Sequence, residues 1–162
     1  MSTPIAKIAL IGHAGAGKDV VWSMLRLIQH EIYTPHANVN VALLKTLEAN
    51  PYLFTKEYDM QYDTFAAPLK HFIASSLGID VVLLHNQDIK HMQYDVFANT
   101  SIRKVHLDVS DMLKSLYGNE FFVNALLHRL QSVKSLYVCV GDCRCPNEYD
   151  ALKQAGFTFI KV

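Results

Sequence analysis

The N-terminal segment combines a strand, a glycine-rich turn and a helix, and this combination restricts the fold more than any other feature of the sequence. An apolar run at 5–11 predicts a buried strand. The turn at 12–19 reads Gly-His-Ala-Gly-Ala-Gly-Lys-Asp, with the G-x-x-x-x-G-K spacing of a phosphate-binding loop. Apolar residues at helical spacing then predict a helix over 20–32, whose inward face carries Val21, Leu25, Ile28 and Ile32.

The turn has the composition of an anion-binding nest. Glycines let consecutive main-chain N–H groups point inward at a helix N-terminus, and Lys18 would reach the β- and γ-phosphates as a point charge. The alternative is a Gly/Ala-rich turn without a ligand, and His13 is either a phosphate contact or a variable loop position. The candidate nucleotide-binding residues are Gly12, His13, Ala14, Gly15, Ala16, Gly17, Lys18 and Asp19.

Two carboxylates, Asp19 and Asp142, are the candidate ligands for Mg²⁺. The residue after the loop lysine is normally Ser or Thr, and here a carboxylate, which is also a hard-cation ligand, takes that position. Asp142 follows the apolar run 136–141, where phosphate-loop enzymes place the acid that orients Mg²⁺ or its water. The alternatives are a first-turn Asp that complements the helix dipole and an ordinary strand-end Asp.

Arg144 follows Asp142 by two residues and would point into the same crevice. Its guanidinium suits bidentate phosphate recognition, whereas a salt bridge to Asp142 or Glu148 is the alternative. Lys70, on the polar side of the helix opened by Pro68, and Arg103, in the first turn of a later helix, are further candidates for phosphate contacts.

Two other arginines have structural interpretations. Arg26 is expected to be solvated on the first helix. Arg129 shares a predicted helix face with apolar residues, so its stem is expected to cover apolar surface while its head stays in water.

Strand and helix patterns alternate along the rest of the chain and predict an α/β fold. We expect a P-loop NTPase fold, with a parallel sheet covered by helices on both faces and ligands at the carboxyl ends of its strands. A single domain is expected over 1–162, with a helical acceptor-binding region at about 68–131. The further expected strands are 58–65, 136–141 and 157–162, and the further helices are 36–50, 67–77, 102–117, 120–130 and 146–155. The inward face of the helix at 102–117 is expected to carry Ile102, Val105, Val109, Met112, Leu113 and Leu116.

Composition excludes several classes of protein. A hydrophobic content of 51% against 19% charged residues predicts a compact chain rather than a disordered one. A formal net charge of zero argues against a broad basic surface for nucleic acid. No apolar run has the length of a membrane span and no signal-peptide pattern is present, so we expect a cytoplasmic protein without a membrane partner. Cys139, Cys143 and Cys145 are expected to be reduced structural thiols.

Three segments together resemble the bacteriophage-type deoxynucleoside monophosphate kinases. That family typically shows a G-K-D loop, an S-F-A-x-P-L-K segment and a D-x-R-x-P-N-E segment in this order. The corresponding segments here are the loop at 12–19, Thr-Phe-Ala-Ala-Pro-Leu-Lys at 64–70 and Asp-Cys-Arg-Cys-Pro-Asn-Glu at 142–148. The segments at 101–103 and 117–123 also resemble the family, so the likeness spans nearly the whole chain.

The resemblance implies phosphorylation of (deoxy)nucleoside monophosphates by ATP with Mg²⁺. It implies acceptor contacts at Phe65, Lys70 and Arg103, with Asp142 and Arg144 at the reacting phosphates. Together with Lys18, the last two are the candidate catalytic residues. Family members are often dimers, so a homodimer is one expectation, and a phage-encoded member would act in the host cytoplasm.

Two departures from the family pattern keep other functions open. Val20 stands where the family commonly has a hydroxyl residue, and no arginine follows Arg144. A partner subunit would then complete the site, or the enzyme would be weak. The alternatives are a non-catalytic or degenerate nucleotide-binding partner protein and a P-loop kinase for another small phosphorylated acceptor, such as a mevalonate phosphate or dephospho-coenzyme A.

Overall fold

The computed structural model describes residues 6–13, 15–33 and 41–162, and its chain divides into two compact units. The sheet unit comprises the residues up to Phe65 together with Ala125–Val162, and the helical unit comprises Ala66–Asn124. The single domain predicted over 1–162, and the acceptor-binding role predicted for 68–131, stay predictions.

The sheet unit is built on four parallel strands in the order β2-β5-β1-β6. Because the strands are parallel, their carboxyl ends share one edge of the sheet. The prediction of an α/β fold with a parallel sheet is therefore confirmed. The strands are β1 (Ala6–Ile11), β2 (Met60–Asp63), β5 (Tyr137–Cys143) and β6 (Thr158–Lys161).

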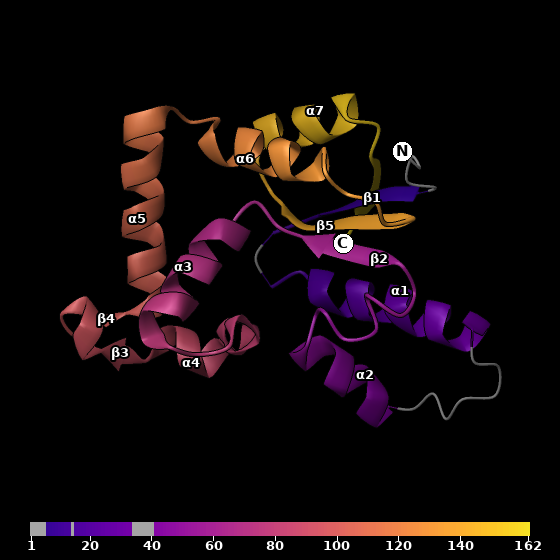
Figure 1. Ribbon diagram of the computed structural model, residues 1–162, viewed down its shortest axis with the longest axis horizontal. Coiled ribbons are helices and arrows are strands. Elements are labelled where there is room, and N and C mark those ends of the chain that lie inside the picture. Colours follow the sequence, from indigo (N-terminus) through magenta and orange to yellow (C-terminus); the bar gives the residue numbers. More distant parts are fainter. Residues whose placement is uncertain (1–5, 14, 34–40) are drawn as a thin grey trace. The chain divides into compact units, whose positions relative to one another are not determined.

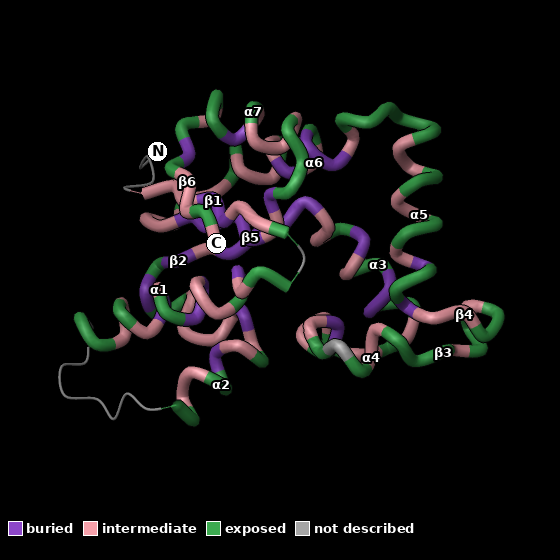
Figure 2. The backbone as a smooth tube through the Cα atoms, turned by 180° about the vertical axis from the view of Figure 1, so that it is seen from behind, coloured by how far each residue is buried: buried purple, intermediate pink, exposed green. Residues whose placement is uncertain are grey.

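Helices lie on both faces of this sheet (Figure 1). On one face are α1 (Lys18–Tyr33) and α2 (Val41–Ala49), and on the other are α7 (Pro146–Gln154) and the part of α6 (Phe121–Leu130) that belongs to the sheet unit. Buried residues concentrate in the strands and the helix faces turned toward them (Figure 2). The core on the α1 side contains Leu10, Trp22, Tyr58, Met60, Tyr62 and Cys139.

The inward face predicted for the first helix is wrong in part. Ile28 and Ile32 are 57% and 63% exposed, whereas Trp22 and Arg26 are buried. The helix is rotated so that one aromatic and one cationic residue face the interior, and a count of aliphatic residues alone misses that face. The second helix, predicted over 36–50, is described from Val41, and 36–40 lie outside the described residues.

The prediction of a solvated Arg26 is wrong. Its guanidinium donates hydrogen bonds to the carbonyl oxygens of Leu47 (2.6 Å), Asn50 (2.6 Å) and Leu53 (3.2 Å). It also lies 5.2 Å from the ring centroid of Trp22. The last carbonyls of a helix have no partner within that helix, so Arg26 closes the C-terminal end of α2. Burial is the main cause that lowers its pKa to about 10.

The helical unit is organised around α3 (Ala67–Leu77) and α5 (Ile102–Tyr117), which pack against each other. Pro68 lies in the first turn of α3, and Gly78 ends it with a φ of 63°. Ser101 caps α5 by accepting a hydrogen bond from the Lys104 N–H. The shorter elements between these helices are η1 (Val81–His85), α4 (Gln87–His91), β3 (Gln93–Tyr94), η2 (Asp95–Phe97) and β4 (Thr100–Ser101).

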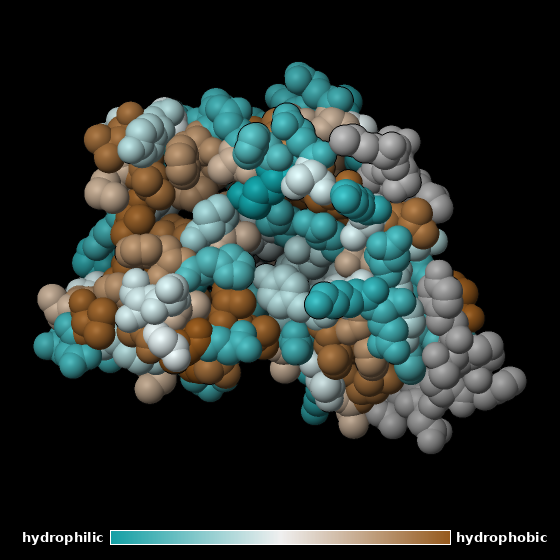
Figure 3. All heavy atoms as spheres, viewed as in Figure 1, coloured by the Kyte–Doolittle hydropathy of each residue, from teal (hydrophilic) through white to brown (hydrophobic). Residues whose placement is uncertain are grey.

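The core stripe predicted along α5 is correct only for its first turns. Ile102 and Val105 are buried, but Met112 and Leu116 are 51% and 66% exposed. Only the N-terminal half of the helix buries its apolar face, and apolar spheres gather over α5 on the surface (Figure 3). No helix within the described ranges is both long enough and apolar enough to cross a bilayer.

Candidate phosphate-binding site

The turn between β1 and α1 depends on its glycines. Gly15 and Gly17 have φ angles of 79° and 91°, a region that glycine adopts without steric cost. The main chain of Val162 approaches Gly12 so closely that a Cβ at position 12 would lie 2.7 Å from the carbonyl oxygen of Val162. His13, Gly15 and Ala16 are exposed, and the predicted contact Ala14 lies outside the described residues.

Lys18 is the first residue of α1 and its ammonium group lies over this turn. The side chain is 6% exposed, and Nζ donates hydrogen bonds to the carbonyl oxygens of Gly12 and His13, both at 2.7 Å. Burial is the largest cause that lowers the pKa of Lys18, and the nearby Arg144 lowers it further. Asp19 and Asp142 act in the opposite direction. The loop lysine thus sits among one further cation and two carboxylates.

Asp142 lies inside β5, not one residue beyond the strand as predicted, because β5 extends to Cys143. Its Oδ1 accepts a hydrogen bond of 2.8 Å from the Phe65 N–H, at the end of the neighbouring strand β2. Asp19 is exposed in the first turn of α1, where a carboxylate also complements the helix dipole. Both carboxylates are hard oxygen donors near Lys18, so their chemistry fits Mg²⁺.

Arg144 is exposed directly after β5. Glu148 accepts hydrogen bonds from the main-chain N–H groups of Arg144 (2.7 Å) and Cys145 (2.9 Å), which caps α7. In the part of the chain that the structure describes, no carboxylate lies within 4.0 Å of the Arg144 guanidinium, so neither predicted salt bridge forms. The charge of Arg144 lowers the pKa of Lys18, so the two cations lie near each other at the loop, where Asp19 and Asp142 oppose this effect.

An ion pair that sequence reasoning missed lies beside Asp142. Arg129 donates to Asp63 Oδ2 through Nε (3.1 Å) and to Oδ1 through a terminal nitrogen (2.9 Å), which also donates to the Thr64 carbonyl oxygen (2.9 Å). The solvated head predicted for Arg129 is therefore wrong. In the sequence, Asp63 is only a charged residue near the end of the strand predicted at 58–65, and Arg129 is only an arginine on a largely apolar helix. No sequence pattern indicates that the two side chains pair.

The remaining predicted contacts are distributed over both units. The Phe65 side chain belongs to the sheet unit and is buried. In the helical unit, Lys70 is half-buried on α3 and Arg103 is exposed in the first turn of α5. Their roles as acceptor contacts stay predictions.

Lys70 has basic neighbours within its own unit. The pKa of His85 is lowered to about 3, mainly by burial and further by the charges of Lys70 and Lys90. The sequence did not indicate that these three groups lie near one another.

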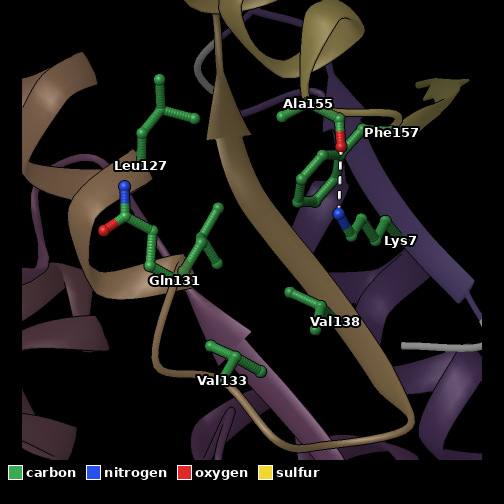
Figure 4. A pocket seen from close by; sticks show the side chains of 8 residues that line it. Lys7, Leu127, Gln131, Val133, Val138, Ala155 and Phe157 are labelled. Carbon is green, nitrogen blue, oxygen red and sulfur yellow. Dashed lines mark hydrogen bonds between the residues drawn. The ribbon is translucent and has the colours of Figure 1, made fainter. Parts of the chain in front are cut away.

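A cavity of about 300 Å³ lies elsewhere in the sheet unit (Figure 4). Apolar side chains form most of its wall, and the Lys7 ammonium donates a hydrogen bond of 3.1 Å to the Ala155 carbonyl oxygen. Lys7 lies near the amino end of β1, roughly 16 Å along the strand from Gly12. The cavity is therefore separate from the candidate site.

Within the described ranges, no three or more His, Cys, Asp or Glu side chains form a metal-ligand group. Comparison with known proteins found no matching family model, no matching curated protein and no matching solved structure.

Proposed function

We propose that this chain is a P-loop kinase that transfers the γ-phosphoryl group of ATP to a (deoxy)nucleoside monophosphate. In this reaction an oxygen of the acceptor phosphate bonds to the γ-phosphorus while the bond from that phosphorus to the bridging oxygen of ADP breaks. The acceptor monophosphate becomes a diphosphate and ADP leaves. At pH 7 the acceptor phosphate is mostly a dianion, so the attack needs no general base.

The observation that carries the proposal is the grouping of charges beside the glycine turn. Lys18 and Arg144 are neighbouring cations, and Asp19 and Asp142 are carboxylates close enough to affect Lys18. They come from the start of α1 and the end of β5, beside a turn with two glycines at positive φ. Phosphoryl transfer is catalysed by positioning and by neutralising charge, which this set can do.

Each residue has a defined part in the proposed site. Main-chain N–H groups of the turn and of the first residues of α1 would bind phosphate oxygens, since the first N–H groups of a helix have no partner within it. Lys18 and Arg144 would bind and orient the reacting phosphates. Asp19 and Asp142 would hold Mg²⁺, which when bound neutralises charge on the phosphates. Phe65, Lys70 and Arg103 are the proposed acceptor contacts, and a homodimer in the cytoplasm remains part of the proposal.

The test is release of ADP from MgATP with each deoxynucleoside and ribonucleoside monophosphate, and with no acceptor. We expect release that requires an acceptor and falls at least about 100-fold in Lys18→Met, the size of loss typical for one transition-state contact. Lys45→Met is the matched control, because Lys45 is an exposed lysine of α2. It should keep wild-type activity.

Other outcomes would select other functions. ATP binding without any ADP release would favour a non-catalytic nucleotide-binding partner. Release with a different phosphorylated acceptor alone would favour a kinase of another small molecule. Equal activity in Lys18→Met and wild type would contradict the assignment of the loop.

A further inference from the structure

The peptide group between Thr64 and Phe65 is held from both sides. Its carbonyl oxygen accepts a hydrogen bond of 2.9 Å from Arg129, and its N–H donates one of 2.8 Å to Asp142 Oδ1. A peptide group is planar, so fixing its carbonyl also fixes the direction of its N–H. Arg129 and Asp142 are thus connected through one rigid group.

Asp63 fixes the same segment from its other side. Its Oδ1 accepts from the Thr64 N–H at 2.7 Å, and the carboxylate as a whole receives Arg129 through two nitrogens. Two parallel bonds hold a guanidinium in one orientation, which a single ammonium cannot reproduce. Asp63 is 8% exposed and Arg129 is 30% exposed at their side chains, so the pair is largely shielded from solvent.

We propose that Arg129 is a positioning residue for Asp142. It holds the Thr64–Phe65 peptide so that the Phe65 N–H fixes one oxygen of the Asp142 carboxylate, and thereby sets the orientation in which that carboxylate serves the metal and phosphates. The role in catalysis rests on the proposed function, but the positioning itself is a property of the sheet unit. Groups that orient a metal-binding carboxylate typically change affinity or activity by about 10- to 100-fold when removed.

The first arm of the test measures positioning without catalysis. Amide hydrogen exchange of the Phe65 N–H, followed by ¹⁵N NMR, should become at least about tenfold faster in Arg129→Gln. The Val140 amide in the interior of β5 is the internal reference and should keep its rate. Arg129→Lys should give an intermediate rate, and it replaces Arg129→Gln if that variant does not fold.

The second arm measures acceptor-dependent ADP release. Arg129→Gln should lower kcat by about 10- to 100-fold and leave KM for ATP within about threefold. In an Asp142→Asn background the same substitution should change kcat by less than about threefold, because its effect passes through that carboxylate. Asp108→Asn is the matched control, since it breaks the exposed Lys104–Asp108 ion pair on α5 and should change neither readout.

The outcomes separate this inference from the proposed function. A wild-type chain without acceptor-dependent ADP release refutes the kinase proposal, and exchange at Phe65 then decides the role of Arg129 alone. Unchanged exchange at Phe65 in Arg129→Gln overturns the inference. So does an equal loss of kcat in the wild-type and Asp142→Asn backgrounds, which a merely structural arginine would give.

Discussion

Replacing Gly141 by Ala should destabilise the sheet unit through one side chain, Tyr62. A Cβ added at Gly141 would lie 2.5 Å from Cε2 of Tyr62, and closer still to Cζ and the hydroxyl oxygen. The ring has little room to move, because it stacks on Trp22 at a centroid distance of 5.1 Å and contacts the edge of Tyr52 at 6.1 Å. Trp22 is itself held by a hydrogen bond of 2.8 Å to the Pro51 carbonyl oxygen.

The expected cost lies at the upper end of the range for overpacking, about 3 kcal/mol, because three atoms of a constrained tyrosine side chain overlap the new methyl group. For a chain of this size this corresponds to a decrease in Tm of about 6–12 °C. Trp22 is the single tryptophan of the sequence and is 1% exposed, so its fluorescence during thermal and urea unfolding reports the change directly.

The control is the same substitution after the ring has been removed. In a Tyr62→Leu background, Gly141→Ala should cost less than about 1 kcal/mol, since the overlapping atoms are absent. Gly156→Ala is the comparison, because its φ is 81° and a Cβ there would meet no atom within 4 Å, so its cost comes from the backbone and should be equal in both backgrounds. A Gly141→Ala penalty below about 1 kcal/mol, or one that Tyr62→Leu does not reduce, would refute the reasoning.

Three further predictions concern buried polar groups. Arg26→Met should lower the free energy of unfolding by about 3 kcal/mol or more, because the carbonyl oxygens of Leu47 and Asn50 at the end of α2 lose their donor. A urea midpoint near that of the wild type would contradict this. An aromatic disulfide reagent should label the exposed Cys145 rapidly in the native chain, but Cys139 and Cys143 only after unfolding. Cys139 and Cys143 are buried, and burial raises the pKa of both thiols, that of Cys143 to about 12. Because the pKa of His85 is lowered from 6.5 to about 3, the unfolded chain binds a proton that the folded chain does not, and stability should fall as the pH falls from about 6.5 toward 3. His85→Leu should flatten that dependence in urea midpoints, and an unchanged slope would show that another group causes it.

The sequence predicted the architecture well wherever a local pattern carries the information. The run before Gly12 became β1, and the helices predicted at 67–77 and 102–117 are α3 and α5. Their ends depend on local chemistry, since Gly78 ends α3 and Ser101 caps α5. The convergence of strand ends was also predictable, since it follows from a parallel sheet. Grouping Lys18, Asp142 and Arg144 needed only that rule and their positions after strands.

The sequence could not predict contacts whose partners are main-chain atoms or distant side chains. Arg26 binds carbonyl groups, which every residue carries, so no residue type marks its partners. Arg129 meets Asp63 across 66 residues, and the choice between a solvated and a paired arginine depends on that tertiary contact. The exposed end of α5 shows the opposite case, in which an amphipathic pattern is present but only half of it is buried.

The central claim is that the turn at 12–18 and Lys18 bind nucleotide phosphates, and calorimetric titration of the chain with MgATP tests it most directly. We expect one ATP bound per chain, and an affinity at least about tenfold lower in Lys18→Met, which corresponds to about 1.4 kcal/mol. Lys45→Met should bind as the wild type does. Absence of binding by the wild-type chain, or equal affinity in the wild type and Lys18→Met, would contradict the account.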